Sequence, residues 1–245
     1  VPASATTGTT FSWSRGVITG ISNPAASGAD TINETLINTT PNPVAVTYID
    51  TLNINGCINT ETITVIVKPT PKLSSSLTPA AICDSATFNY PPTSATVGTT
   101  FDWTRDFVSG IAVVAGSGTN NPNEQLINTT YHNVNVTYTY TLTADGCTNT
   151  QDVVVTVRPT PVLSSALTQT VCSGVPFNYT ATSITPATTF SWTRAFVSGI
   201  SPVNGTGSTA NINETLVDSL TTSKTVTYVY TLNISGCTHK QNVTV

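Results

Sequence analysis

The sequence TTFSWTR at 188–194 decides the fold, because the chain contains nearly the same sequence twice before. The earlier copies are TTFSWSR at 9–15 and TTFDWTR at 99–105. A fixed internal period indicates a repeat architecture. The chain is therefore predicted to be a tandem array of one module about 90 residues long, and we expect its only three tryptophans to lie in the module cores: Trp13, Trp103 and Trp192.

The extent of each module follows from this alignment. A unit of about 90 residues can bury its own hydrophobic core, unlike the short repeats of a solenoid. The sequence predicts a partial module at 1–69 without its first two strands, a complete module at 70–159, and a module at 160–245 with a shortened last strand. Lys68-Pro69-Thr70-Pro71 and Arg158-Pro159-Thr160-Pro161 are expected to be short, semi-rigid joints, because proline fixes φ. We expect the modules to form a rod.

Both ends of the sequence fall inside a module, since Val1 aligns with Pro91 and the last strand stops at QNVTV. We expect either that the polypeptide continues in both directions or that neighbouring subunits supply the missing strands.

The strongest strand signal is VTYTYTLT at 136–143, where apolar residues alternate with threonine as in a half-buried antiparallel strand. Asp145-Gly146 favours a tight hairpin turn, and DVVVTV at 152–157 is the returning strand. The residues predicted to face inward on the first of these strands are Val136, Tyr138, Tyr140 and Leu142.

The rest of the module reads as short strands and loops. PKLSSSL at 71–77 and ATFNY at 86–90 are predicted as its first two strands. Frequent turn signals and the lack of helical periodicity favour an all-β architecture of tandem immunoglobulin-like sandwiches with Greek-key connections. Asp50 occupies the inward slot of Tyr140 and Tyr230. We expect it near a strand end that water reaches.

Composition excludes several classes of function. Only 8% of the residues are charged and the net charge is −4, so no basic patch for nucleic acid is expected. No apolar run is long enough to span a membrane. His132 and His239 do not recur and have no catalytic partner at a recognisable spacing, so we expect solvated histidines. The sequence predicts no enzyme, no metal site and no cofactor.

One arginine and one glutamate recur in register in every module. As a functional feature, they would bind a charged ligand. As a structural feature, they would form an ion pair at the core edge, where Arg105 shares a strand face with Trp103 and stacks on the ring or needs a partner. We favour the structural interpretation. The predicted pairs are Arg15 with Glu34, Arg105 with Glu124, and Arg194 with Glu214.

The five cysteines fall into two classes, which indicates an oxidising, extracytoplasmic compartment. Cys57, Cys147 and Cys237 follow the hairpin glycine, whereas Cys83 and Cys172 precede the second strand.

Two disulfide pairings are open. Pairing within modules joins Cys83 to Cys147 and Cys172 to Cys237, but these turns lie at opposite poles of a sandwich, roughly 25 Å apart. A disulfide needs Cα atoms within about 7 Å. In a head-to-tail rod the poles of successive modules meet, which favours Cys83 with Cys237 across the joint. Cys57, Cys147 and Cys172 would then pair with cysteines of modules outside this chain.

The order of motifs resembles the PKD-like repeats of Bacteroidota surface proteins. It runs from Cys-Ser-Gly before a Phe-x-Tyr strand, through TTFSWTR and NINETL, to VTYVYTLNISGC and VTVxPTP. The WDFGDG sequence of ordinary PKD domains is replaced by WTR. The resemblance implies a non-enzymatic immunoglobulin-like sandwich in a very large secreted adhesin of the bacterial cell surface, including gliding-motility adhesins exported by the type IX system.

Glycosylation is a further expectation. Asp followed by Ser or Thr and an aliphatic residue is similar to the O-glycosylation motif of Bacteroidota, and a glycan would protect an exposed fibre. The candidate acceptors are Thr31, Thr51, Ser85 and Ser219. Asn-x-Ser/Thr sequons also occur, for example at Asn38, Asn128, Asn204 and Asn213, but arise easily by chance in a chain rich in Asn and Thr.

Three functions remain open. The first is a stalk and multivalent adhesive surface, with neighbouring repeats and surface glycan as partners. The second is a filament subunit that donates a strand to its neighbour. The third is a carbohydrate-binding module, which would need exposed aromatic residues. The loop 107–122 and its counterparts 17–32 and 196–212 differ most between modules, and loops of that kind are where binding specificity usually resides.

Overall fold

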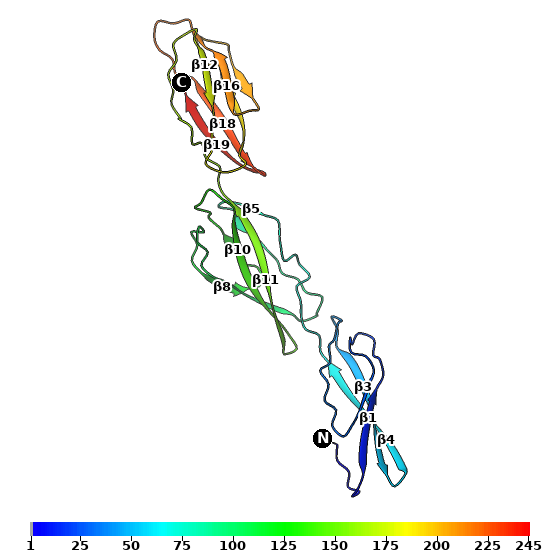
Figure 1. Ribbon diagram of the computed structural model, residues 1–245. Helices are drawn as coiled ribbons and strands as arrows, with labels where there is room; N and C mark the ends of the chain where they lie inside the picture. Colours follow the sequence, from blue (N-terminus) through cyan, green and yellow to red (C-terminus); the bar gives the residue numbers. More distant parts are fainter. Residues whose placement is uncertain (1) are drawn as a thin grey trace.

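The computed structural model describes residues 2–245, which contain strands and no helix (Figure 1). We call the three successive groups of strands the first, second and third units. The first unit contains β1(Thr10–Arg15), β2(Ala26–Ala29), β3(Val44–Ile54) and β4(Cys57–Val67). The prediction of an all-β, immunoglobulin-like fold is confirmed.

The second and third units contain the remaining strands. Those of the second unit are β5(Ile82–Cys83), β6(Thr87–Phe88), β7(Thr100–Arg105), β8(Gly116–Thr119), β9(Glu124–Gln125), β10(Val134–Ala144) and β11(Cys147–Arg158). Those of the third unit are β12(Pro176–Thr180), β13(Thr189–Arg194), β14(Ile200–Ser201), β15(Gly205–Gly207), β16(Asn211–Thr215), β17(Val217–Asp218), β18(Thr227–Ile234) and β19(Cys237–Thr244).

The second unit is a sandwich of two layers. Its larger sheet has the order β5-β11-β10-β7-β8, and β6 pairs with β9 in the other layer. Asn, Asp or Ser followed by Gly turns each long hairpin, with positive φ at both residues, for example Asp145 and Gly146. The inward residues of β10 have no exposed surface, and neither do Val153, Val155 and Val157 of β11. Phe88 and Leu126 close this core from the opposite layer.

The third unit repeats this plan with the sheet β15-β13-β18-β19 and the pair β12-β16. The first unit has only the sheet β2-β1-β3-β4 among the described residues. Its β4 therefore lies open: Ile63 is 39% and Val65 42% exposed, although the aligned Val153 and Val155 are completely buried.

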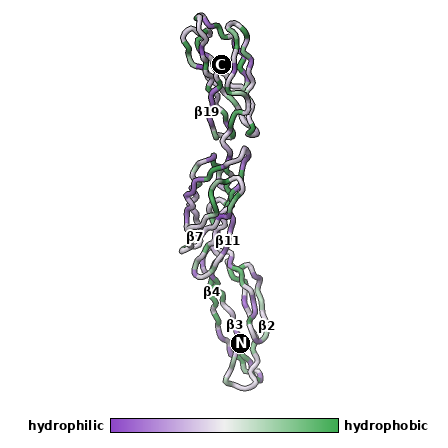
Figure 2. The backbone as a smooth tube through the Cα atoms, turned by 90° about the vertical axis from the view of Figure 1, so that its left-hand side faces the viewer, coloured by the Kyte–Doolittle hydropathy of each residue, from purple (hydrophilic) through white to green (hydrophobic). Residues whose placement is uncertain are grey.

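Apolar and polar residues are mixed along the backbone of all three units (Figure 2), as expected for strands with one buried face. None of the described residues belongs to a helix with the length and hydropathy of a bilayer span.

Two expectations about local structure need correction. PKLSSSL at 71–77 is not a continuous strand, because only Leu73 forms an isolated bridge with Ser94. Other backbone groups of this segment bond to a different strand: the carbonyl of Leu77 accepts a hydrogen bond from the amide of Val154 on β11. Asp50 does not lie near a strand end. It is only 6% exposed inside β3, and its Oδ1 has no hydrogen-bond partner among the described residues.

Candidate functional site

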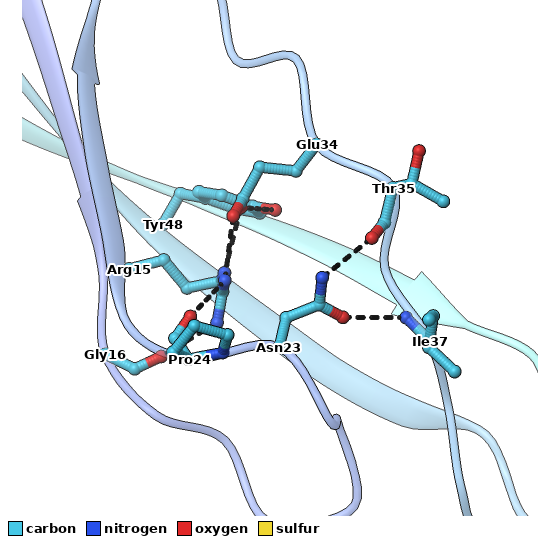
Figure 3. A network of polar contacts seen from close by, with 8 residues as sticks. All are labelled: Arg15, Gly16, Asn23, Pro24, Glu34, Thr35, Ile37 and Tyr48. Atoms are coloured by element: carbon cyan, nitrogen blue, oxygen red, sulfur yellow. Dashed lines mark hydrogen bonds and ion pairs between the residues drawn. The ribbon is translucent and has the colours of Figure 1, made fainter.

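The recurring arginine and glutamate meet in a buried network, shown for the first unit in Figure 3. Arg15 at the end of β1 points at Glu34 from the loop before β3, and its Nε and Nη2 donate to Oε2 and Oε1 at 2.9 and 2.8 Å. Nη2 also donates to the carbonyl of Pro24 at 2.7 Å. Tyr48 donates its hydroxyl proton to Glu34 Oε2 at 2.7 Å. The carboxylate is thus held by three donors.

The same network occurs in the other units. Arg105 contacts Glu124 at 2.9 Å and Arg194 contacts Glu214 at 3.0 Å. The third member was not anticipated from the sequence, although it also recurs in register. It is the tyrosine that donates to the carboxylate: Tyr138 in the second unit and Tyr228 in the third.

Burial sets the electrostatics of this network. The arginine side chains have no exposed surface, so each needs its partner. Burial alone would raise the pKa of Glu124, but hydrogen bonds from Arg105 and Tyr138 hold that pKa below its usual value. Hydrogen bonds from Arg15 likewise lower the pKa of Glu34. Because the arginine side chains are buried and each carboxylate accepts hydrogen bonds from arginine and tyrosine, we interpret the pairs as structural.

Acid is expected to destabilise the first and second units. Because the pKa values of Glu34 and Glu124 are lower in the folded state, unfolding takes up protons. The stabilisation is complete above the unfolded carboxyl pKa of about 4.3 and is lost as the pH falls through the folded value. Urea unfolding followed by circular dichroism at pH 7 and pH 3 measures this. The variant Glu124→Gln should flatten the dependence, whereas Glu61→Gln, at an exposed glutamate, should not.

The core tryptophans require glycine on the neighbouring strand. Trp103 is 6% exposed, and its ring lies against Gly118 of β8. A Cβ atom on Gly118 would come within 2.9 Å of the ring. Gly118 and its counterparts Gly28 and Gly207 each lie against a core tryptophan and therefore act through packing, which the sequence alone did not indicate.

Gly118→Ala is expected to lower the free energy of unfolding by about 1–3 kcal/mol through this overlap. Gly16→Ala is the control, since nothing lies within 4 Å of its Cβ position, and its effect should stay within about 0.5 kcal/mol. Thermal unfolding of both variants provides the comparison. Equal shifts would contradict the steric explanation.

The second and third units are joined by a disulfide. Cys83, on β5, is bonded to Cys237, which begins β19, with Cα atoms 5.5 Å apart. Arg158 Nη1 donates to the carbonyl of Ser235 at 3.1 Å across the same joint. Thr160 of the linker donates its hydroxyl to Asp84 at 2.7 Å.

Both linkers are also fastened to the unit that follows them. Their prolines are buried, and Asn149 donates its amide to the carbonyl of Pro71 at 3.0 Å. His239 lies in the position of Asn149, with Nδ1 3.0 Å from the carbonyl of Pro161. The expectation of a solvated His239 is therefore wrong, because the ring is half-buried against the linker.

The joint between the first and second units repeats one of these contacts. Lys68 Nζ donates to the carbonyl of Asp145 at 2.7 Å, as Arg158 does to Ser235. No disulfide accompanies it in the described chain. Cys147 is a half-buried free thiol, and Cys57 and Cys172 are exposed free thiols.

The loops that vary between units expose large apolar side chains. Phe107 and Phe196 occupy the same position two residues after the network arginine and are 67% and 63% exposed. Val17 takes this position in the first unit and is 74% exposed. These aromatic residues were missed from the sequence because only their alignment, and no local motif, marks them.

The candidate glycosylation residues differ in accessibility. Thr31, Ser85 and Ser219 are exposed, whereas Thr51 lies half-buried within β3 between two neighbouring strands. Asn128 is only 5% exposed, and its amide donates to the carbonyls of His132 and Val157. The Asn128 side chain therefore has a structural role and is not accessible to a glycan.

Residues 80–161, from β5 to the second linker, match the PKD-like domain family. This segment is a PKD-like domain. No curated protein matches the chain.

Solved structures are similar at a low level. Drosophila OTK extracellular domains 3–5 share 12% identity with a TM-score of 0.35, covering 96% of this chain and 84% of that one. A variant of titin domains I67–I69 shares 12% with a TM-score of 0.37, covering 97% and 87%. The endo-fucoidan hydrolase MfFcnA4 shares 12% with a TM-score of 0.28, covering 97% and 38%.

The PKD-like domain and the disulfide together indicate an extracellular location. No group of three or more His, Cys, Asp or Glu side chains in residues 2–245 is arranged to hold a metal ion.

Proposed function

We propose that this chain is a non-enzymatic structural and adhesive repeat region of a secreted cell-surface fibre. The observation that carries the proposal is the joint between the second and third units, where Cys83 is bonded to Cys237 and Arg158 contacts Ser235. A covalent bond between neighbouring units serves a load-bearing stalk, and independent enzyme domains have no need of it.

A rod is supported by the likeness of the two joints. Lys68 and Arg158 each reach the hairpin turn of the following unit, and the linker prolines are buried in both. Repeated contacts at equal positions favour one repeated orientation. Small-angle X-ray scattering should then give a pair-distance distribution with a long tail, as for a thin rod. A compact distribution would exclude the rod.

The adhesive surface is proposed to be the variable loop of each unit. Phe107 and Phe196 project from these loops, and exposed rings suit contacts with the apolar faces of sugars or with proteins. One such contact per unit is weak, but several along one fibre raise the overall affinity. Surface glycan is therefore the partner we propose.

We further propose that this repeat region belongs to a large Bacteroidota adhesin, which the type IX system exports to the bacterial surface. Exposed residues such as Thr31 and Ser219 would carry O-glycans. The motif order described for the sequence supports this origin. A catalytic role is not proposed, because the buried carboxylates are saturated by arginine and tyrosine donors.

The adhesive role is tested by the double variant Phe107→Ser with Phe196→Ser. Exchanging the loop 107–122 for the sequence of 196–212 keeps a phenylalanine at its first position, so this exchange should leave binding unchanged if the rings make the contact. The double variant should fold, because Phe107 and Phe196 are 67% and 63% exposed, and the exchange keeps the buried isoleucine of the loop, since Ile200 takes the place of Ile111. The double variant is expected to reduce binding of chain-coated beads to bacterial surface polysaccharide at least tenfold. The control is Val97→Ser, at an exposed residue outside the variable loops. Unchanged binding of the double variant would exclude these loops as the contact site.

A second candidate is a filament subunit that accepts a strand from its neighbour. The open face of β4, with Ile63 and Val65 exposed, favours this candidate. The mass of the native polypeptide, reduced and fully denatured, separates the two. A mass many times 25.6 kDa supports a continuous repeat array, and a mass near 25.6 kDa supports a polymerising subunit.

A further inference from the structure

On β4 of the first unit, residues that face a buried core in the other units are exposed. Ile63 and Val65 align with Val153 and Val155, which are completely buried. A hollow of about 250 Å³ lies beside Asp50 and Ile63. At the corresponding place in the second unit, Tyr90 packs on Tyr140 with ring centroids 5.5 Å apart.

In the second and third units, residues 71–90 and 161–179 cover the strand that corresponds to β4. These two segments define what fits the open face of β4. Each begins after the linker, passes the larger sheet, and crosses into the opposite layer. The carbonyls of Leu77 and Leu167 accept hydrogen bonds from Val154 and Thr244 of the last strand. Both segments then read aliphatic-Cys-x₄-Phe-Asn-Tyr: ICDSATFNY at 82–90 and VCSGVPFNY at 171–179.

The first unit retains the polar groups that recognise such a segment. In the second unit, Asn149 donates to the carbonyl of Pro71, and Gln151 Oε1 accepts from the amide of Leu73 at 2.6 Å. Asn59 and Glu61 occupy the same positions on β4. Both are exposed, and within residues 2–245 their side chains hydrogen-bond only to each other, Asn59 Nδ2 donating to Glu61 Oε1 at 3.3 Å.

A free thiol stands at the end of this face. The contact of Lys68 with Asp145 brings the hairpin that precedes Cys147 to the end of β4. At the next joint, Cys83 pairs beside Arg158 and is bonded to Cys237, which aligns with Cys147. A segment that pairs beside Lys68 in the same way would place its cysteine against Cys147.

We propose that the face of β4 binds an extended segment of the pattern aliphatic-Cys-x₄-Phe-x-Tyr, and that its cysteine forms a disulfide with Cys147. The segment is supplied by the same polypeptide, as the covering segments of the second and third units are, so the inference rests on the proposed repeat array. Two thiols lose two protons and two electrons as the S–S bond forms. The acceptor is a small-molecule disulfide, such as oxidised glutathione, which is reduced to two thiols.

The test uses the full chain and a synthetic peptide with the sequence of residues 71–90. The two are incubated in a glutathione redox buffer, and disulfide-linked peptides are mapped by mass spectrometry. We expect the peptide cysteine on Cys147 at least tenfold more than on Cys57 or Cys172, although the latter two are more exposed. If the peptide is linked to Cys57 or Cys172 as much as to Cys147, or more, the proposal is overturned.

Two matched controls separate docking from simple thiol reactivity. A peptide with Phe88→Asp and Tyr90→Asp keeps its cysteine but loses the apolar anchors, so the preference for Cys147 should disappear. The chain variant Val65→Asp should lose it too, while keeping the Cys83–Cys237 bond as a sign that the other units are folded. Preference retained with both changes would show that the face does not select the segment.

The source is identified in the native protein by mapping the partner of Cys147 before reduction and measuring the polypeptide mass after it. A partner cysteine within the same polypeptide is expected. A partner in a separate polypeptide overturns the proposed source, and a free Cys147 thiol overturns the site. Neither result affects the binding by variable loops or the scattering of the rod, which test the proposed function separately.

Discussion

Glu124→Gln is expected to lower the free energy of unfolding of the second unit by about 3–5 kcal/mol. The substitution keeps the size of the side chain but removes the charge that balances Arg105, whose side chain has no exposed surface. Tyr138 would then donate to a weaker acceptor. The cost arises from a buried cation without a partner.

Hydrogen exchange resolves this effect by unit, because peptides from β10 report on the second unit alone. Protection in 134–144 should fall strongly with Glu124→Gln, while protection in β18 stays unchanged. Tyr138→Phe should cost only about 1 kcal/mol, the usual net contribution of one hydrogen bond. Replacing both charges, with Arg105→Met and Glu124→Leu, should cost less than Glu124→Gln alone. If the single variant stays within 1 kcal/mol of wild type, the ion pair does not hold the core edge.

Cys237→Ser is expected to have the second large effect, a loss of up to about 5 kcal/mol. This is the chain-entropy value for a loop with the sequence separation of 154 that the disulfide closes. The effect should be shared by the second and third units, because the loop contains most of both.

Thermal unfolding of Cys237→Ser measures this loss, and reduction of the wild-type disulfide should reproduce it. Cys57→Ser is the matched control, since Cys57 follows the equivalent hairpin turn but is an exposed free thiol. Its unfolding temperature should equal that of wild type. A Cys237→Ser variant as stable as Cys57→Ser would mean that the bond does not contribute to stability.

The sequence predicted what periodicity and turn chemistry encode. The alternation at 136–143 marked the inward face of β10, and Asp145-Gly146 marked its turn, because both signals are local. It did not predict that PKLSSSL lacks a continuous strand, since its partners come from two separate segments, the loop at 93–94 and β11. Asp50 and His239 were misplaced for a similar reason: their surroundings depend on which segments cover a sheet edge or a linker.

Some residues of the candidate site can be recognised in the sequence only when the repeats are compared with one another. Arg105 and Glu124 stood out because charge is rare in this chain, whereas Tyr138 was hidden among the alternating residues of β10. Gly118 looked like a loop glycine until the ring of Trp103 was seen against it. Phe107 is a single exposed residue, and exposure is a property of the folded surface.

The Cys83–Cys237 bond also decides which residues carry tension when the chain is pulled at its ends. The covalent path runs from residue 83 through the two sulfur atoms to residue 237, so the residues between them are bypassed. At roughly 3.5 Å per extended residue, the sequence separation of 154 corresponds to about 540 Å of hidden length. A stretched, oxidised chain lengthens mainly through its first unit. Reduction releases the rest, so the redox state of one bond sets how far the fibre extends before it breaks.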